Sequence, residues 1–80
     1  MRIEFRHGVP DGCAQWLREN VGPGNIMEGT NGRKWHATED QPEYAWFYER
    51  VEHADINVCH VPTITVKDPK LAVFFALRWA

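Results

Sequence analysis

The sequence predicts a single small α+β domain, a mainly antiparallel sheet of four or five strands with two helices packed on one face, in the order β-α-β-β-β-α. A strand pattern followed by a helix pattern stands at each end of the chain, and a hairpin signal lies between these two units. The 80 residues suffice for one domain, residues 1–80, and 44% of them are hydrophobic, as in an ordinary globular protein.

The first strand–helix unit occupies the beginning of the chain. Arg2–Arg6 alternates between charged and apolar side chains, which is typical of a half-exposed strand. Pro10 and Asp11 follow, and the apolar residues of Cys13–Val21 are spaced by three and four, as in an amphipathic helix packed on a sheet. Gly22-Pro23-Gly24 ends this helix, because Gly adopts the left-handed C-terminal conformation and Pro cannot continue the hydrogen-bond ladder.

The second strand–helix unit closes the chain. Thr63–Lys67 has β-branched residues in alternation, and Asp68 and Pro69 then provide an N-cap and a first helical residue. The helix is expected to run to Trp79, with Arg78 in the last turn, where a cation suits the helix dipole. Four apolar side chains form a broad face of this helix that must be covered: Leu71, Phe74, Phe75 and Leu77.

A hairpin is predicted in the middle of the chain. Asn31-Gly32 is the preferred pair for a type I′ turn, which would join a weak strand at Ile26–Glu28 to a strand at Arg33–Thr38. Tyr44–Val51 fits a helical face by spacing, but its density of aromatic residues favours a strand, and we prefer the strand.

The segment before the last strand leaves two interpretations open. After a turn near Ala54-Asp55, Ile56–Val61 forms another strand or an extended loop. Pro62 restricts it to a sheet edge or to a break before the final strand.

Composition narrows the classes of function. A net charge of −2, with no polybasic run, argues against strong non-specific nucleic-acid binding and against binding to anionic lipid. The longest apolar run, Leu71–Leu77, is too short to cross a bilayer, and the N-terminus lacks the apolar stretch of a signal peptide. We therefore expect a cytoplasmic protein, in the host cytoplasm if it is phage-encoded, whose two cysteines are reduced.

Histidine and cysteine residues are the first candidates for chemistry. Six are present: His7, Cys13, His36, His53, Cys59 and His60. None forms the close pair that a structural zinc site uses, so we expect no metal site and no cofactor. Cys13 in the first turn of a helix, with His7 one loop earlier, is the most enzyme-like arrangement, but Cys13 also falls on the apolar helix face, which favours a packed and inert thiol.

An aromatic surface is the stronger candidate for function. On a strand at Tyr44–Val51, Ala45 and Phe47 would face the helices, while the other rings would face away beside Trp35. The predicted partner-binding residues are Trp35, Tyr44, Trp46, Tyr48 and Arg50. Such rings anchor protein partners, and with Arg33, Lys34 and Arg50 they would also stack single-stranded nucleic acid. Alternatively, Val51–Pro62 or a second copy of the chain covers this face.

The C-terminal segment adds a resemblance. Val66-Lys67-Asp68-Pro69-Lys70-Leu71-Ala72, followed by Phe75-Ala76-Leu77-Arg78-Trp79, resembles the ending of small uncharacterised accessory proteins of tailed bacteriophages. It covers about a quarter of the chain and transfers no functional residue. It implies an accessory factor that binds a host or viral protein.

The sequence thus predicts a small non-enzymatic protein-binding module that acts on a host or viral protein or associates with itself, without a membrane or cofactor. The alternatives are a weak single-strand nucleic-acid binder that uses the same rings, and third a small cysteine enzyme built on Cys13 and His7.

Overall fold

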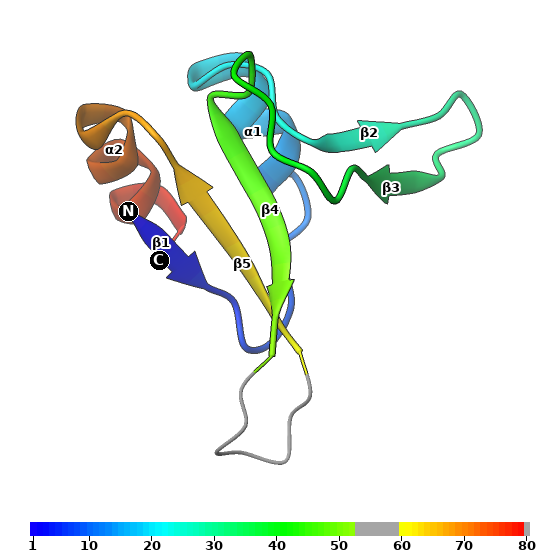
Figure 1. Cartoon of the computed structure of the whole chain (residues 1–80), viewed down its shortest axis with the longest axis horizontal. Helices are drawn as coiled ribbons and strands as arrows, with labels where there is room; N and C mark the ends of the chain where they lie inside the picture. Colours follow the sequence, from blue (N-terminus) through cyan, green and yellow to red (C-terminus); the bar gives the residue numbers. More distant parts are fainter. Residues whose placement is uncertain (53–59, 80) are drawn as a thin grey trace.

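The computed structural model describes residues 1–52 and 60–79 and confirms the α+β class (Figure 1). Two helices and five strands occupy this part of the chain. In order, they are β1 (Arg2–Glu4), α1 (Cys13–Asn20), β2 (Ile26–Glu28), β3 (Lys34–His36), β4 (Trp46–Val51), β5 (Val61–Val66) and α2 (Pro69–Trp79). The preference for a strand over a helix at Tyr44–Val51 is confirmed by β4.

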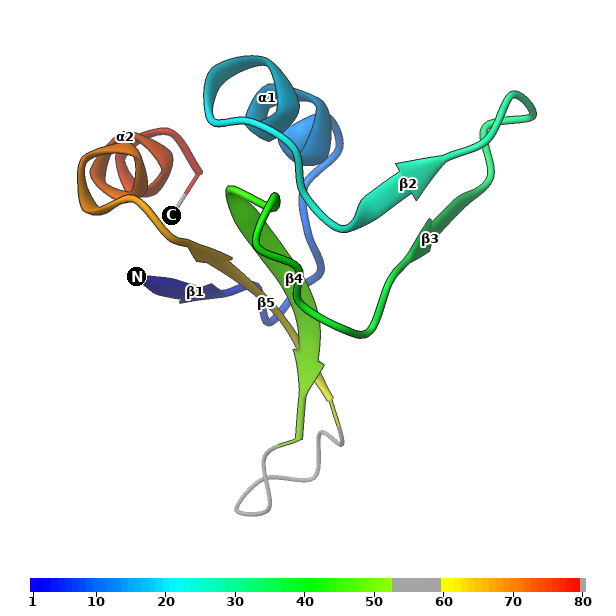
Figure 2. The same cartoon turned by 45° about the horizontal axis from the view of Figure 1, so that its top comes forward.

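The five strands form two antiparallel sheets instead of one continuous sheet. The larger has the order β1-β5-β4, and β2 and β3 form a separate hairpin that projects away from it (Figures 1 and 2). The hairpin meets β4 through one parallel bridge, between Gly24 and Trp46, and through the side chain of Asn25. Because a side chain takes over the pairing at this junction, the hairpin can leave the plane of the larger sheet.

Both helices cover the same face of the larger sheet (Figure 2). Its register places Trp46 opposite Val66 and Tyr48 opposite Ile64, so these side chains share the helix-covered face. They meet buried residues of both helices in one core, whose fully buried members include Cys13, Leu17, Trp46, Ile64, Val66, Ala72 and Phe75. A ring contact between Phe5 and Phe75 joins the residue after β1 to helix α2, and one between Trp16 and Trp79 joins the two helices.

Pro62 does not break the final strand, contrary to the prediction. It lies inside β5, the central strand of the larger sheet, and pairs with Arg50. Its carbonyl accepts a hydrogen bond from Phe5 N–H on the β1 side, beyond the end of β1 at Glu4. Since N–H and C=O of one strand residue point the same way, the missing N–H of Pro62 also faces that side, and the β4–β5 ladder is intact. Residues 56–59 of the proposed extra strand lie outside the described residues.

The predicted helix start at Asp68 is confirmed. Its carboxylate accepts hydrogen bonds from the N–H groups of Lys70 and Leu71 at 2.8 and 3.2 Å. Helix α1 begins differently: its N-cap is Gly12, with φ 84°, and no side chain in the described part of the chain caps it.

The hairpin turn is not of type I′. A type I′ turn needs positive φ at both central residues, but among the described residues only glycines have positive φ. Gly32 N–H donates to Gly29 O, Gly29 N–H donates to Arg33 O, and Gly32 has φ 78°. The turn is therefore a three-residue loop whose last residue, Gly32, is left-handed, with Asn31 Oδ1 accepting from Arg33 N–H at 3.0 Å.

Candidate functional site

A half-open groove of about 510 Å³ lies between the β1–α1 loop, helix α1, the β2–β3 hairpin and strand β4. Small-molecule and side-chain pockets are of this size, roughly 300–1,000 Å³. Six of its lining residues carry rings or positive charge: Arg18, Lys34, Trp35, His36, Tyr48 and Arg50. We call this the basic groove, and it is the candidate functional site.

Three of the five predicted partner-binding residues meet in the basic groove: Trp35, Tyr48 and Arg50. Trp35 comes from β3 and exposes 55% of its surface, although it is one of the largest apolar side chains. Tyr48 and Arg50 lie two residues apart on β4, so both point to the same side of the sheet. Arg50 is exposed, whereas Tyr48 is half-buried because it also packs against the core.

Trp46 is not a surface residue, and its prediction as a partner-binding residue is wrong. Its side chain has no exposed surface and lies in the centre of the core. The indole Nε1 donates a hydrogen bond to Gly22 O at 2.8 Å, which satisfies the buried donor. The ring packs so closely on Gly24 that a Cβ at that position would overlap it.

The burial of Trp46 also reverses the predicted orientation of β4. Trp46 and Tyr48 lie on the helix-covered face, while Phe47, opposite Thr65, lies on the other face. Ala45 still packs against the core, at the point where the chain enters the strand. An aromatic strand with rings at successive positions places some of them on each face, so only the tertiary packing decides which face is buried.

Tyr44 does not belong to the basic groove. It is half-buried in the segment before β4, where its N–H donates to Gln41 O at 3.1 Å. It does not line the groove.

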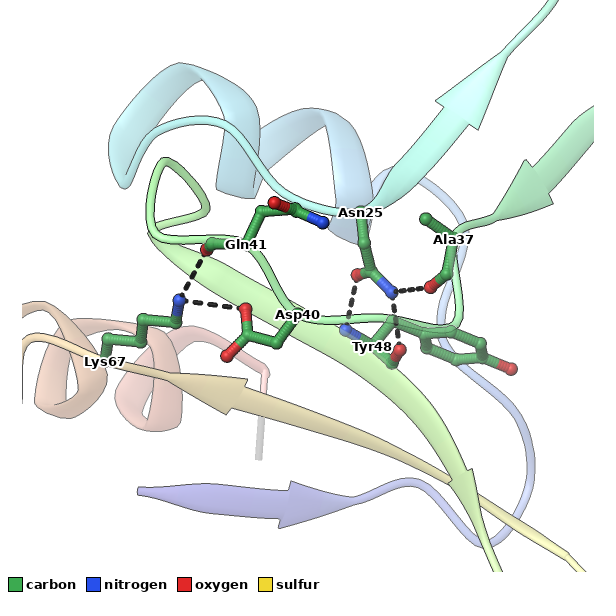
Figure 3. A network of polar contacts seen from close by, with 6 residues as sticks. All are labelled: Asn25, Ala37, Asp40, Gln41, Tyr48 and Lys67. Atoms are coloured by element: carbon green, nitrogen blue, oxygen red, sulfur yellow. Dashed lines mark hydrogen bonds and ion pairs between the residues drawn. The ribbon is translucent and has the colours of Figure 1, made fainter.

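Asn25 is the residue that holds the groove together, and sequence reasoning missed it. It is fully buried, and Figure 3 shows its amide between the hairpin and β4. Nδ2 donates to Ala37 O at 2.8 Å and to Tyr48 O at 2.7 Å, while Oδ1 accepts from Tyr48 N–H at 2.6 Å. The side chain thus pairs with both backbone groups of Tyr48 as a neighbouring strand would.

A second polar contact fastens the segment between β3 and β4. Lys67 Nζ lies 2.9 Å from Asp40 Oδ1 and donates to Gln41 O at 3.0 Å (Figure 3). The pair is exposed, so it contributes at most about 1 kcal/mol to stability. It positions the segment that leads into β4.

The charge of the basic groove differs from that of the whole chain. Among the residues that the structure describes, Arg18, Lys34 and Arg50 line it, against one lining carboxylate, that of Asp11. The whole chain has 9 Lys and Arg against 11 Asp and Glu. Concave surfaces lined by one sign of charge attract ligands of the opposite sign.

Two rings of the groove pack against each other. His36 and Tyr48 lie edge to face, with centroids 4.9 Å apart and an interplanar angle of 77°. Trp35, the neighbour of His36 on β3, points to the opposite face of the strand, and its exposed ring lies beside Gly29. Arg18 and His36 were not among the predicted site residues, because only the tertiary fold brings helix α1 and strand β3 to one groove.

Cys13 has the properties of a packed thiol. It is fully buried, and this burial raises its pKa from 9.0 to about 11, although Arg78 acts in the opposite direction. A nucleophilic cysteine needs a lowered pKa and access to substrate. His7, its proposed partner, is an exposed residue of the loop before α1.

Metal-binding side chains do not gather in groups of three or more within residues 1–52 and 60–79. His53 and Cys59 lie outside the described residues. Within the same ranges, neither helix has the length and apolar character needed to cross a bilayer.

Comparison of the chain with protein-family models, curated protein sequences and solved structures gave no match. The functional argument therefore rests on the residues of the site.

Proposed function

We propose that this chain is a small non-enzymatic protein-binding module whose basic groove takes an acidic segment of a partner protein. The observation that carries the proposal is that Arg18, Lys34 and Arg50 line one groove together with Trp35 and Tyr48, on a chain with a net charge of −2. The C-terminal resemblance to phage accessory proteins favours a host or viral protein as the partner.

The chemistry of the groove supports this choice of ligand. Trp, Tyr and Arg dominate the affinity of protein interfaces, since they combine large contact areas with directed hydrogen bonds. Guanidinium groups bind carboxylates through two parallel hydrogen bonds, as Arg50 can do with Asp or Glu of a partner. Asn25 fixes the backbone of Tyr48 in the unbound protein, and this reduces the conformational entropy that is lost on binding.

Single-stranded nucleic acid is the second candidate ligand. Trp35 lies on the hairpin beside Lys34, and Arg33 is exposed one residue further, so a base could stack on the indole while cations contact phosphates. The overall acidic balance opposes this candidate, because nucleic-acid binding depends on a positive surface.

A displayed library of random 12-residue peptides tests the proposal. It is selected on the wild-type chain and counter-selected on Arg50→Gln, and selected peptides are then titrated by fluorescence anisotropy. We expect enrichment of Asp and Glu, and at least tenfold weaker binding by Arg50→Gln and Trp35→Ala, because a charged hydrogen bond contributes about 1.5–3 kcal/mol.

Lys34→Gln is the test variant and Arg33→Gln its matched control, because both remove one positive charge from neighbouring positions. Lys34 lines the groove and its neighbour Arg33 does not, so only Lys34→Gln should weaken the peptides. Peptides without acidic enrichment, or equal losses in both variants, would refute binding in the groove. Tighter binding of an oligothymidine than of any selected peptide, with affinity that falls steeply with salt, would assign the second candidate instead.

A further inference from the structure

Helix α2 is apolar on two opposite faces. Ala72 and Phe75 are buried against the sheet. On the far side Val73, Phe74 and Leu77 expose 50%, 63% and 80% of their surfaces. We call these three residues the α2 ridge. A helix that is hydrophobic all round is normally buried, and larger apolar patches on a surface mark interaction sites.

A shallow groove runs beside the α2 ridge. It has a volume of about 270 Å³, lies between α1 and α2, and is lined by Trp16, Asn20, Val21, Leu71 and Phe74. Phe74 therefore belongs both to the ridge and to the wall of this groove. A ridge next to a groove is the surface onto which a second helix packs, because its side-chain rows interdigitate with both.

A positively charged side chain flanks the α2 ridge on each side in the sequence. Lys70 precedes it and Arg78 follows it, and Pro69–Trp79 contains no acidic residue. The carboxylate that directly precedes this helix in the sequence, that of Asp68, caps the helix N-terminus. Arg78 is exposed, and its guanidinium lies 4.4 Å from the centroid of the Trp79 ring.

These observations point to one kind of occupant, and we propose that the α2 ridge binds an amphipathic helix of a partner protein whose apolar stripe is flanked by acidic residues. The stripe covers Phe74 and Leu77 and fills the adjoining groove, and the acidic flanks meet Lys70 and Arg78. This site is separate from the basic groove, since the two share no lining residue. The helix and the hairpin also lie at opposite ends of the molecule (Figures 1 and 2).

A second copy of this chain fits the ridge less well. In an antiparallel two-fold pair of α2 helices centred on Phe74, Lys70 of one copy meets Arg78 of the other. In a parallel pair, each of these cations meets its own counterpart. Both arrangements set like charges together, which opposes association and favours an acidic partner.

A library of 18-residue peptides with helical apolar spacing and randomised flanks tests the proposal. It is selected on the wild-type chain and counter-selected on Phe74→Ser/Leu77→Ser, two exposed sites whose substitution spares the core. We expect enriched Glu and Asp flanks, at least tenfold weaker binding by the double variant, and three- to tenfold weaker binding by Lys70→Gln/Arg78→Gln. Arg50→Gln, which alters only the basic groove, should leave the affinity unchanged.

Three results would overturn the proposal. The first is no enrichment over the counter-selected variant, and the second is enrichment of Lys and Arg flanks. The third is a wild-type dimer in sedimentation velocity that the double variant loses, which would assign the ridge to a second copy. Circular dichroism of each variant confirms that lost binding does not reflect lost structure.

Discussion

Replacement of Gly24 by Ala tests the packing that buries Trp46. An added Cβ would overlap three atoms of the indole, Cε2, Cδ2 and Cζ2. The ring cannot turn aside, because it is fully buried and its Nε1 is bonded to Gly22 O. The substitution must therefore displace either the backbone bridge at Gly24 or the indole itself.

The expected loss of stability follows from these two outcomes. Overpacking of a core costs about 1–3 kcal/mol, and removing a large aromatic ring from a core costs about 3–5 kcal/mol. Since burial and the hydrogen bond to Gly22 O keep the indole in place, we expect Gly24→Ala to lower the free energy of unfolding by at least about 3 kcal/mol. A domain of this size has roughly 4–12 kcal/mol in total, so the variant should lose a large part of its stability.

Urea unfolding followed by circular dichroism measures this loss, with the same amount of a stabilising osmolyte in every sample. Gly32→Ala is the control, because no atom of residues 1–52 or 60–79 lies within 4 Å of its added Cβ and its φ of 78° opposes the change. Its cost should be about 1–2 kcal/mol. In a Trp46→Leu background, Gly24→Ala should become nearly neutral. Equal costs for the two glycines, or an unchanged cost without the indole, would refute the reasoning.

Three further predictions concern stability. Trp46→Phe should cost at least about 1 kcal/mol more than Trp79→Phe in urea unfolding, because Trp46 Nε1 is bonded, whereas buried Trp79 Nε1 has no hydrogen-bond partner within residues 1–52 and 60–79; equal losses would contradict this. Asn25→Ala should cost about 3 kcal/mol or more, since it leaves buried backbone groups of Tyr48 unpaired, and amide exchange at Tyr48 should accelerate. Burial of Cys13 favours the neutral thiol, so the folded state binds this proton more tightly than the unfolded state. The stabilising contribution of Cys13 is therefore complete below pH 9 and is lost as pH rises from about 9 to about 11. Over that range wild type should lose up to about 2–3 kcal/mol more than Cys13→Ala, and parallel pH profiles would refute the assignment.

Signals that act within a few residues of the sequence predicted the local structure well. Asp68 caps α2 where expected, because a cap depends only on the next three residues. The aromatic density of Tyr44–Val51 correctly favoured a strand over a helix. Asn31-Gly32 correctly predicted the β2–β3 hairpin but not its turn type, since the hairpin closes through Gly29 and needs positive φ only at Gly32.

The buried face of β4 could not be predicted, because its sequence offers large apolar side chains to both faces. The choice is made by Gly24, more than twenty residues earlier, whose missing side chain provides room for the indole. Gly24 was interpreted only as part of a helix end. From the neighbouring residues alone, a glycine that ends a helix cannot be distinguished from a glycine whose missing side chain makes room for a buried ring.

The same long-range contact explains why part of the predicted site survives without Trp46. Once Trp46 enters the core, the two-residue period of the strand also directs Tyr48 and Arg50 toward the helix-covered side of β4. Both residues line the groove that β4 shares with helix α1 and the β2–β3 hairpin. Asn25 joins the hairpin to Tyr48, which brings Trp35 to the same groove as Arg50. The aromatic surface that the sequence predicted on an open sheet face therefore exists in reduced form, at a junction between two sheets, and it depends on one buried amide.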